Sequence, residues 1–112
     1  MDDQKLEMEI QMLHNRICYE LADPTRILLL YHLSESPRYV NELVDALHIP
    51  QSTISRHLGV LRERHLVTTE RVGSAIRYTL EDKRIIEALD IMRGILATQL
   101  ASSIELAHSL ID

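Results

Sequence analysis

The sequence predicts a mainly α-helical fold with one small β-hairpin. Apolar residues recur at helical steps of three and four over most of the chain, and they alternate with polar residues over one short segment. A chain of 112 residues has room for one domain, residues 1–112, with a single hydrophobic core. We therefore expect five helices, with the hairpin between the fourth and the fifth.

Two helices are expected in the first third of the chain. The first covers about residues 1–21, and Asp23-Pro24 then predicts a stop and a restart, with Asp as the N-cap and Pro at the first helical position. The second helix, over about residues 24–33, is almost wholly apolar at its centre, so it should be the most buried helix. The apolar stripe of the first helix comprises Leu6, Ile10, Leu13, Ile17 and Leu21.

Residues 40–64 fit two short helices joined by a tight connection. The third helix is expected near residues 40–47, and the fourth begins around residue 51, where the hydroxyl of Ser52 or Thr53 can cap it. This is the helix-turn-helix pattern. The buried positions of the fourth helix should be Ile54, Leu58 and Leu61.

Residues 67–80 fit a β-hairpin. Residues 67–72 and 75–80 alternate as strands do, with Gly73-Ser74 as a two-residue turn between them. A hairpin directly after a helix-turn-helix is a wing, so the predicted fold is a winged helix-turn-helix. The wing places Arg71 and Arg77 near its tip, where they could reach phosphates or a minor groove.

The last segment, from residue 82, is predicted to be one long helix. At ~1.5 Å per residue it would be ~45 Å long, and so small a domain cannot cover an apolar stripe of that length. We therefore expect residues 1–21 and 82–112 to be the dimerisation helices of a symmetric homodimer. The alternative is a monomer whose terminal helices cover the core. The stripe comprises Ile85, Leu89, Met92, Leu96, Leu100, Ile104, Ala107 and Ile111.

Charge is unevenly distributed along the chain. The whole sequence has a formal net charge of -5, but between residues 51 and 77 there are five arginines and only two glutamates. One basic face on an acidic body is what phosphate binding needs. The alternative is that these arginines form an ordinary solvated surface.

Composition excludes several classes of protein. No apolar run approaches the ~18 residues of a membrane span, the Met1-Asp2-Asp3 start is unlike a signal peptide, and Cys18 is the only cysteine. We therefore expect a cytoplasmic protein with no membrane partner. The absence of Phe and Trp argues against a reader of single strands or RNA. The glycines are isolated and catalytic motifs are missing, so an enzyme is not expected.

Several stretches resemble the ArsR/SmtB family of repressors. Residues 20–28 (ELADPTRIL) are similar to that family's second-helix signature, and residues 49–58 with Leu61-Arg62 are similar to its recognition helix. Leu66-Val67 and the wing residues 71–78 complete a match in order and spacing over about residues 17–80. His48 stands where the family often has Gly or Asn, a mild cost because His tolerates a left-handed backbone.

The resemblance implies a recognition helix in the major groove of double-stranded DNA. Arg56 could hold guanine bidentately and Gln51 could pair with adenine, while hydroxyls suit phosphates or base edges. Helix capping or simple exposure is the alternative for each polar residue, and Arg26 should be a structural residue or a phosphate contact. The expected DNA contacts are Gln51, Ser52, Thr53, Ser55, Arg56 and His57, with Arg71, Ser74 and Arg77 in the wing.

Members of this family commonly release DNA when a metal binds or thiols are oxidised, but the usual sites are absent from this sequence. The third-helix site needs neighbouring cysteines, and residues 41–45 contain none. The last-helix zinc site needs Asp, His, His and Glu, whereas Asp90 is accompanied by Met92, Ser103 and Leu106. A dithiol switch is excluded because a second cysteine is lacking.

Three hypotheses remain for the signal, and the cofactor is unknown. His14 and Cys18 lie four residues apart, a spacing able to bind one metal ion, and Glu105 and His108 lie three apart near the end of the last helix. In a dimer the two pairs could converge on one metal site. The second hypothesis is Cys18 alone as a redox sensor, and the third is no ligand at all. The alternative to a functional thiol is a buried Cys18 that acts as a small hydrophobe.

Together these features predict a sequence-specific transcriptional repressor. A homodimer would place two recognition helices in successive major grooves of an inverted repeat, with half-sites about 10 base pairs or a small multiple apart. An inducer would act by favouring a dimer geometry that no longer matches the grooves. The alternative is a winged-helix dimer that binds another protein and not DNA.

Overall fold

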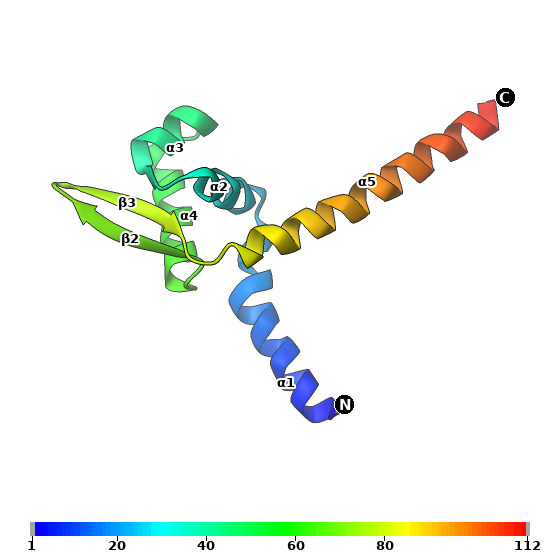
Figure 1. Cartoon of the computed structure of the whole chain (residues 1–112), viewed down its shortest axis with the longest axis horizontal. Helices are drawn as coiled ribbons and strands as arrows, with labels where there is room; N and C mark the ends of the chain where they lie inside the picture. Colours follow the sequence, from blue (N-terminus) through cyan, green and yellow to red (C-terminus); the bar gives the residue numbers. More distant parts are fainter. Residues whose placement is uncertain (1, 112) are drawn as a thin grey trace. The chain divides into compact units, whose positions relative to one another are not determined.

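The computed structural model describes residues 2–111 and contains the predicted helices and hairpin (Figure 1). Its contacts divide the chain into two units, Met1–Asp82 and Lys83–Asp112, and the second unit is a single long helix. Whether the chain behaves as the single domain expected over residues 1–112 stays a prediction. In chain order the elements are α1 (Asp3–Leu13), the π-helical turn η1 (His14–Cys18), the 3₁₀ turn η2 (Glu20–Ala22), α2 (Pro24–Glu35), β1 (Arg38–Tyr39), α3 (Val40–Leu47), α4 (Gln51–Glu63), β2 (Val67–Val72), β3 (Ala75–Leu80) and α5 (Arg84–Ile111).

The first helix is less regular than its apolar stripe predicts. Regular α-helix ends at Leu13, and the next turn is π-helical, with the Tyr19 N–H donating to the carbonyl of His14 over 2.9 Å. The 3₁₀ turn η2 then leads into α2. The sequence pattern did not reveal this change, because steps of four residues fit an α-helical and a π-helical turn equally well.

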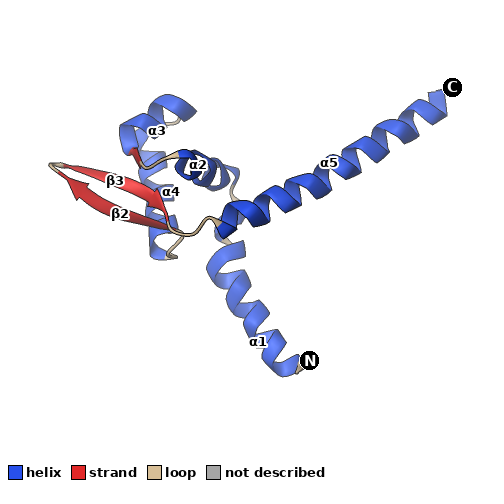
Figure 2. Ribbon diagram, viewed as in Figure 1, coloured by secondary structure: helices blue, strands red, loops and turns tan. Residues whose placement is uncertain are grey.

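The sheet has one strand more than the sequence predicts. Its order is β1-β3-β2, and both pairings are antiparallel. Figure 2 shows the two long strands as the hairpin that forms the wing. In the hairpin, Val67 pairs with Leu80 and Val72 with Ala75, as the expected strand bounds require. The strand β1 was missed because two residues are too few to show an alternating pattern.

The core of the first unit lies between α2, α3, α4 and the start of β2. The three predicted core positions of α4 are fully buried. As expected, α2 exposes the smallest share of its residues among the described helices: only Pro24, Leu28 and Glu35 are exposed, although α4 contains one more fully buried side chain. Core side chains come from Leu29, Leu30, Leu33, Leu43, Ile54, Leu58, Leu61, Leu66 and Val67.

Most predicted helix and turn boundaries are present. The Asp23 carboxylate accepts a hydrogen bond from the Thr25 N–H at 2.8 Å, so it caps α2 as expected. His48 has φ 55, the left-handed conformation that its place in the turn requires, and Gly73 has φ 64 in the hairpin turn. The predicted hydroxyl cap of α4 is wrong. The N-cap is Pro50, without a side-chain cap bond, because Ser52 and Thr53 already lie inside the helix.

The second unit, α5, presents a long apolar surface in the described chain. Met92, Leu96, Leu100 and Ile104 are each between 50% and 58% exposed. Within residues 2–111, no helix is both long and apolar enough to cross a membrane. These exposed side chains form a long apolar face on α5.

Candidate nucleic-acid interface

The helix α4 has one apolar face and one polar face. Its apolar positions lie in the core, and Gln51, Ser52, Ser55 and Arg56 are exposed, while Thr53 is half-buried. Positions 51 and 55, and 52 and 56, are four residues apart, so these side chains share one side of the helix. The polar face thus presents an amide, hydroxyls and a guanidinium, which are groups that hydrogen-bond base edges and phosphates.

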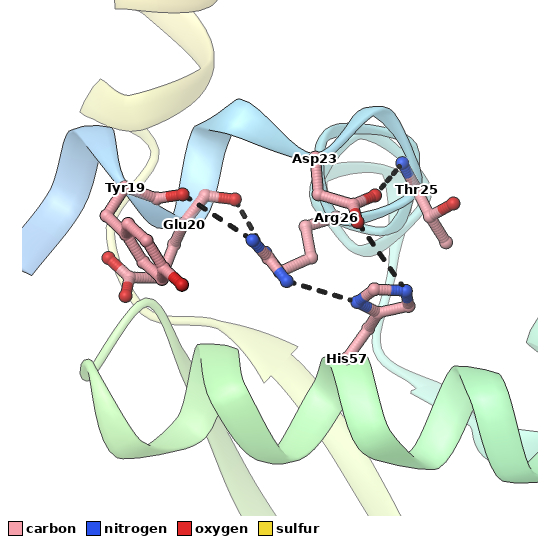
Figure 3. Close-up of polar contacts among 6 residues, drawn as sticks. All are labelled: Tyr19, Glu20, Asp23, Thr25, Arg26 and His57. Atoms are coloured by element: carbon pink, nitrogen blue, oxygen red, sulfur yellow. Dashed lines mark hydrogen bonds and ion pairs between the residues drawn. The ribbon is translucent and has the colours of Figure 1, made fainter.

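His57 does not belong to this face, so its prediction as a DNA contact is wrong. It is 5% exposed and points into the protein from α4, as Figure 3 shows. Its Nδ1 lies 3.3 Å from Nη1 of Arg26 and its Nε2 lies 3.9 Å from Oδ2 of Asp23. The helical period contained the signal, because His57 is three residues after Ile54 and therefore lies beside the apolar stripe.

Electrostatics favour the neutral form of His57. Burial lowers the pKa of His57; the Asp23 carboxylate raises it, and the guanidinium groups of Arg26 and Arg56 lower it further. In the neutral ring, Nδ1 can accept the hydrogen bond that Arg26 donates, with the remaining proton on Nε2 facing Asp23. The pKa of Asp23 is itself lowered, chiefly by the hydrogen bond from the Thr25 N–H.

Arg26 has the contacts of a structural residue, one of the two roles expected for it. Its Nε donates to the Glu20 carbonyl at 2.7 Å and its Nη2 to the Tyr19 carbonyl at 3.5 Å, while Nη1 donates to His57 (Figure 3). One side chain on α2 therefore joins the turn η2 to the helix α4. These hydrogen bonds alone account for the position of the Arg26 side chain.

Glu20 adds a second connection between the same two segments. The residue is 1% exposed, and its Oε1 lies 3.3 Å from Nε of Arg64, at the end of α4. Sequence reasoning missed this role, since a glutamate in a helical segment is usually a solvated surface group. Only the three-dimensional fold brings Glu20 and Arg64 together, because they are far apart in sequence.

Within residues 2–111, Arg77 of the wing forms an ion pair and Arg71 forms none. Arg71 is exposed on β2, and Ser74 is exposed in the turn. Arg77 lies opposite Glu70 in the hairpin and forms an ion pair with it, so part of its charge is neutralised. Arg71 therefore keeps more of its positive charge available to an anion than Arg77 does.

A hollow joins the polar face of α4 to the wing. It is lined by residues 39–41 around the start of α3, by Ser55 of α4, by Ser74 of the hairpin turn, and by Ala75, Ile76 and Tyr78 of β3. Asn41 and Ser74 line its sides, and neither the hollow nor Asn41 was predicted from the sequence. Through Ser55 and Ser74 the hollow borders both the polar face of α4 and the hairpin turn.

The candidate ligand-binding residues lie outside this surface. His14 and Cys18 are both exposed in η1, so the alternative of a buried Cys18 is wrong for the single chain. Glu105 and His108 are exposed on α5, in the other unit. No group of three or more His, Cys, Asp or Glu side chains within residues 2–111 could hold a metal ion. A metal site formed by both pairs across a dimer stays a prediction.

Comparison with known proteins gives matches in the same part of the chain. Residues 23–69 match the family described as bacterial regulatory protein, arsR family. The HTH-type transcriptional repressor SmtB of Mycobacterium tuberculosis is 48% identical over 65 residues, which are 58% of this chain and 48% of that protein. The chain spans about half the length of several curated relatives that it matches.

Two further likenesses extend over most of the chain. Rv0081, an HTH-type transcriptional regulator of Mycobacterium tuberculosis, is 35% identical over 91 residues, 80% of each protein. Its crystal structure aligns with a TM-score of 0.75 at 33% identity, covering 85% of this chain and 96% of that one. The transcriptional repressor BigR of Xylella fastidiosa aligns with a TM-score of 0.72 at 30% identity, covering 85% and 96%.

Proposed function

The chain belongs to the ArsR family of bacterial regulatory proteins, and on that premise we propose that it is a homodimeric, DNA-binding transcriptional repressor. Its recognition helix is α4, and its wing is the β2–β3 hairpin. The relatives SmtB and BigR are described as transcriptional repressors, which supports the same role for this chain.

The polar face of α4 is the observation that carries the proposal. Gln51, Ser52, Ser55 and Arg56 are exposed together, and the opposite face of the helix is fully buried. A helix held this way can enter a major groove without exposing apolar side chains to the bases. Arg71 and Ser74 extend the contact to the backbone, with Thr53 and Arg77 as weaker contributors because each is partly buried.

The dimer is supported by the apolar surfaces of the terminal helices. No residue of α1 is buried, and its apolar side chains Met8, Ile10 and Met12 are more than half exposed. The helix α5 shows a similar apolar surface along its length. A second copy of the chain would cover both. Two recognition helices would then read an inverted repeat with half-sites about 10 base pairs, or a small multiple, apart.

The proposal also includes an inducer that releases the repressor from DNA. The exposed thiol of Cys18 and the neighbouring His14 make a metal ion or a thiol oxidant the first candidates for an inducer. An inducer would shift the dimer toward a geometry in which the two copies of α4 no longer fit the groove spacing.

The test is operator binding by an Arg56→Ala variant, measured by fluorescence anisotropy on DNA from just upstream of the gene. Loss of a base contact should cost about 1–3 kcal/mol and relax the preference for the operator over scrambled DNA. Arg62→Ala is the charge control, because Arg62 is an exposed cation in the last turn of the same helix, six residues along the chain from Arg56. Unchanged operator affinity of Arg56→Ala would refute the recognition-helix assignment. Failure of the wild-type protein to bind any upstream fragment would favour a protein-binding module.

A further inference from the structure

A partly buried polar cluster behind α4, in which His57 is buried and Arg26 is half-buried, links the recognition helix to the turn that follows Cys18. Arg26 donates to the carbonyls of Tyr19 and Glu20 and to Nδ1 of His57, so three different segments meet at one guanidinium (Figure 3). None of these groups lies on the exposed face of α4. The cluster therefore does not contact DNA in the proposed complex.

Geometry makes this link specific to arginine. The guanidinium is planar and donates in several fixed directions, whereas a lysine ammonium is a single point charge on a flexible stem. Only a guanidinium group can donate to two successive backbone carbonyls on one side and to an imidazole nitrogen on the other. The Glu20–Arg64 pair joins the same turn to the end of α4, so the helix is held at two places seven residues apart.

We propose that Arg26 is a positioning residue for DNA recognition, which ties α4 through His57 to the turn at residues 19–22 and so sets the position of the base-contacting side chains. The inference rests on the proposed DNA-binding function and adds to it a group that acts without touching DNA. It also predicts that a change in the turn after Cys18 reaches α4 through this link.

The loss of positioning should affect specific and non-specific binding differently. Base contacts require the side chains of α4 to sit at defined positions, and non-specific binding depends mainly on the total number of phosphate contacts. A misplaced α4 keeps its charges. Arg26→Lys should therefore weaken operator binding while leaving the affinity for scrambled DNA within about twofold of the wild type.

Two substitutions at His57 provide a matched pair. His57→Asn places an amide oxygen near the position of Nδ1 and keeps an acceptor for Arg26, whereas His57→Leu removes the acceptor. We expect His57→Leu and Arg26→Lys each to reduce the ratio of operator to scrambled affinity about tenfold, and His57→Asn to retain most of it. The double variant Arg26→Lys/His57→Leu should lose no more than either single variant, because both changes break one link.

The experiment measures both affinities by anisotropy, with the active fraction of each variant determined by stoichiometric titration. Amide hydrogen exchange of the DNA-free protein is recorded in parallel at residues 19–22 and 55–60. The link predicts faster exchange in both segments for Arg26→Lys and His57→Leu, but not for His57→Asn. Wild-type discrimination by Arg26→Lys and His57→Leu, or additive losses in the double variant, would overturn the proposal. If the wild type itself shows no discrimination, the proposed function fails, and the exchange data alone then decide whether the link exists.

Discussion

Replacing Leu100 by Ala should weaken the dimer about 30-fold. Leu100 is 55% exposed on α5 in the single chain, within the stripe that we assign to the dimer interface. Complete burial of a Leu side chain contributes about 1.5–3 kcal/mol, so covering the exposed half contributes about 1 kcal/mol. The substitution occurs in both subunits of a symmetric dimer. The combined loss is about 2 kcal/mol, which is about 30-fold in the dissociation constant.

Leu106→Ala is the control for this prediction. Leu106 is 62% exposed on the same helix, the chemical change is identical, and six residues of helix place it on a different side from Leu100. Sedimentation equilibrium over a range of protein concentrations measures both dissociation constants. Equal weakening by the two substitutions would show that the stripe does not define the interface, and no weakening by Leu100→Ala would show that α5 does not dimerise through it.

Three further predictions concern charge, pH and metal binding. Arg71→Ala should lower the slope of log affinity against log salt by about 1 to 2 for operator and scrambled DNA alike, and Arg77→Ala should lower it less, because Glu70 already neutralises Arg77. Thermal unfolding should show that stability falls as the pH drops below 6.5, the ordinary pKa of His57, because the unfolded chain then binds a proton that the buried ring resists. His57→Asn should lack that component, and an identical pH profile in the variant would contradict the assignment. Zn(II) titration should show a bound ion that Cys18→Ser removes; unchanged affinity in Cys18→Ser would rule out the His14–Cys18 metal site.

Local patterns were sufficient for most of the fold. Asp23-Pro24 predicted the start of α2 because a capping carboxylate and a fixed φ act on adjacent backbone groups. The hairpin was predicted from alternation and from Gly73, which adopts φ 64 in the turn. The strand β1 could not be predicted in this way. It exists because β3 offers it a partner, and that pairing is a long-range interaction.

The candidate site was less accessible to sequence reasoning. The exposed positions of α4 follow from its period once the buried positions are known, and those were predicted correctly. The hydrogen-bond partners of Arg26 were not predicted. One acceptor is the Glu20 carbonyl in η2, and another is His57 of α4, which lies 31 residues further along the chain. Periodicity tells which side of a helix is buried but does not identify the segment that packs against it.

His57 shows how a polar residue can be assigned more reliably. In the order Ile54, His57, Leu58, Leu61, the histidine occupies a step of the apolar stripe, so a helix that buries the stripe must also bury the ring. A buried imidazole needs hydrogen-bond partners, and a partner on another segment makes the residue a link between segments. The same reasoning limits the base-reading set of α4 to side chains off the stripe, so sequence preference should depend on Gln51, Ser52, Ser55 and Arg56, and on His57 only through the position of the helix.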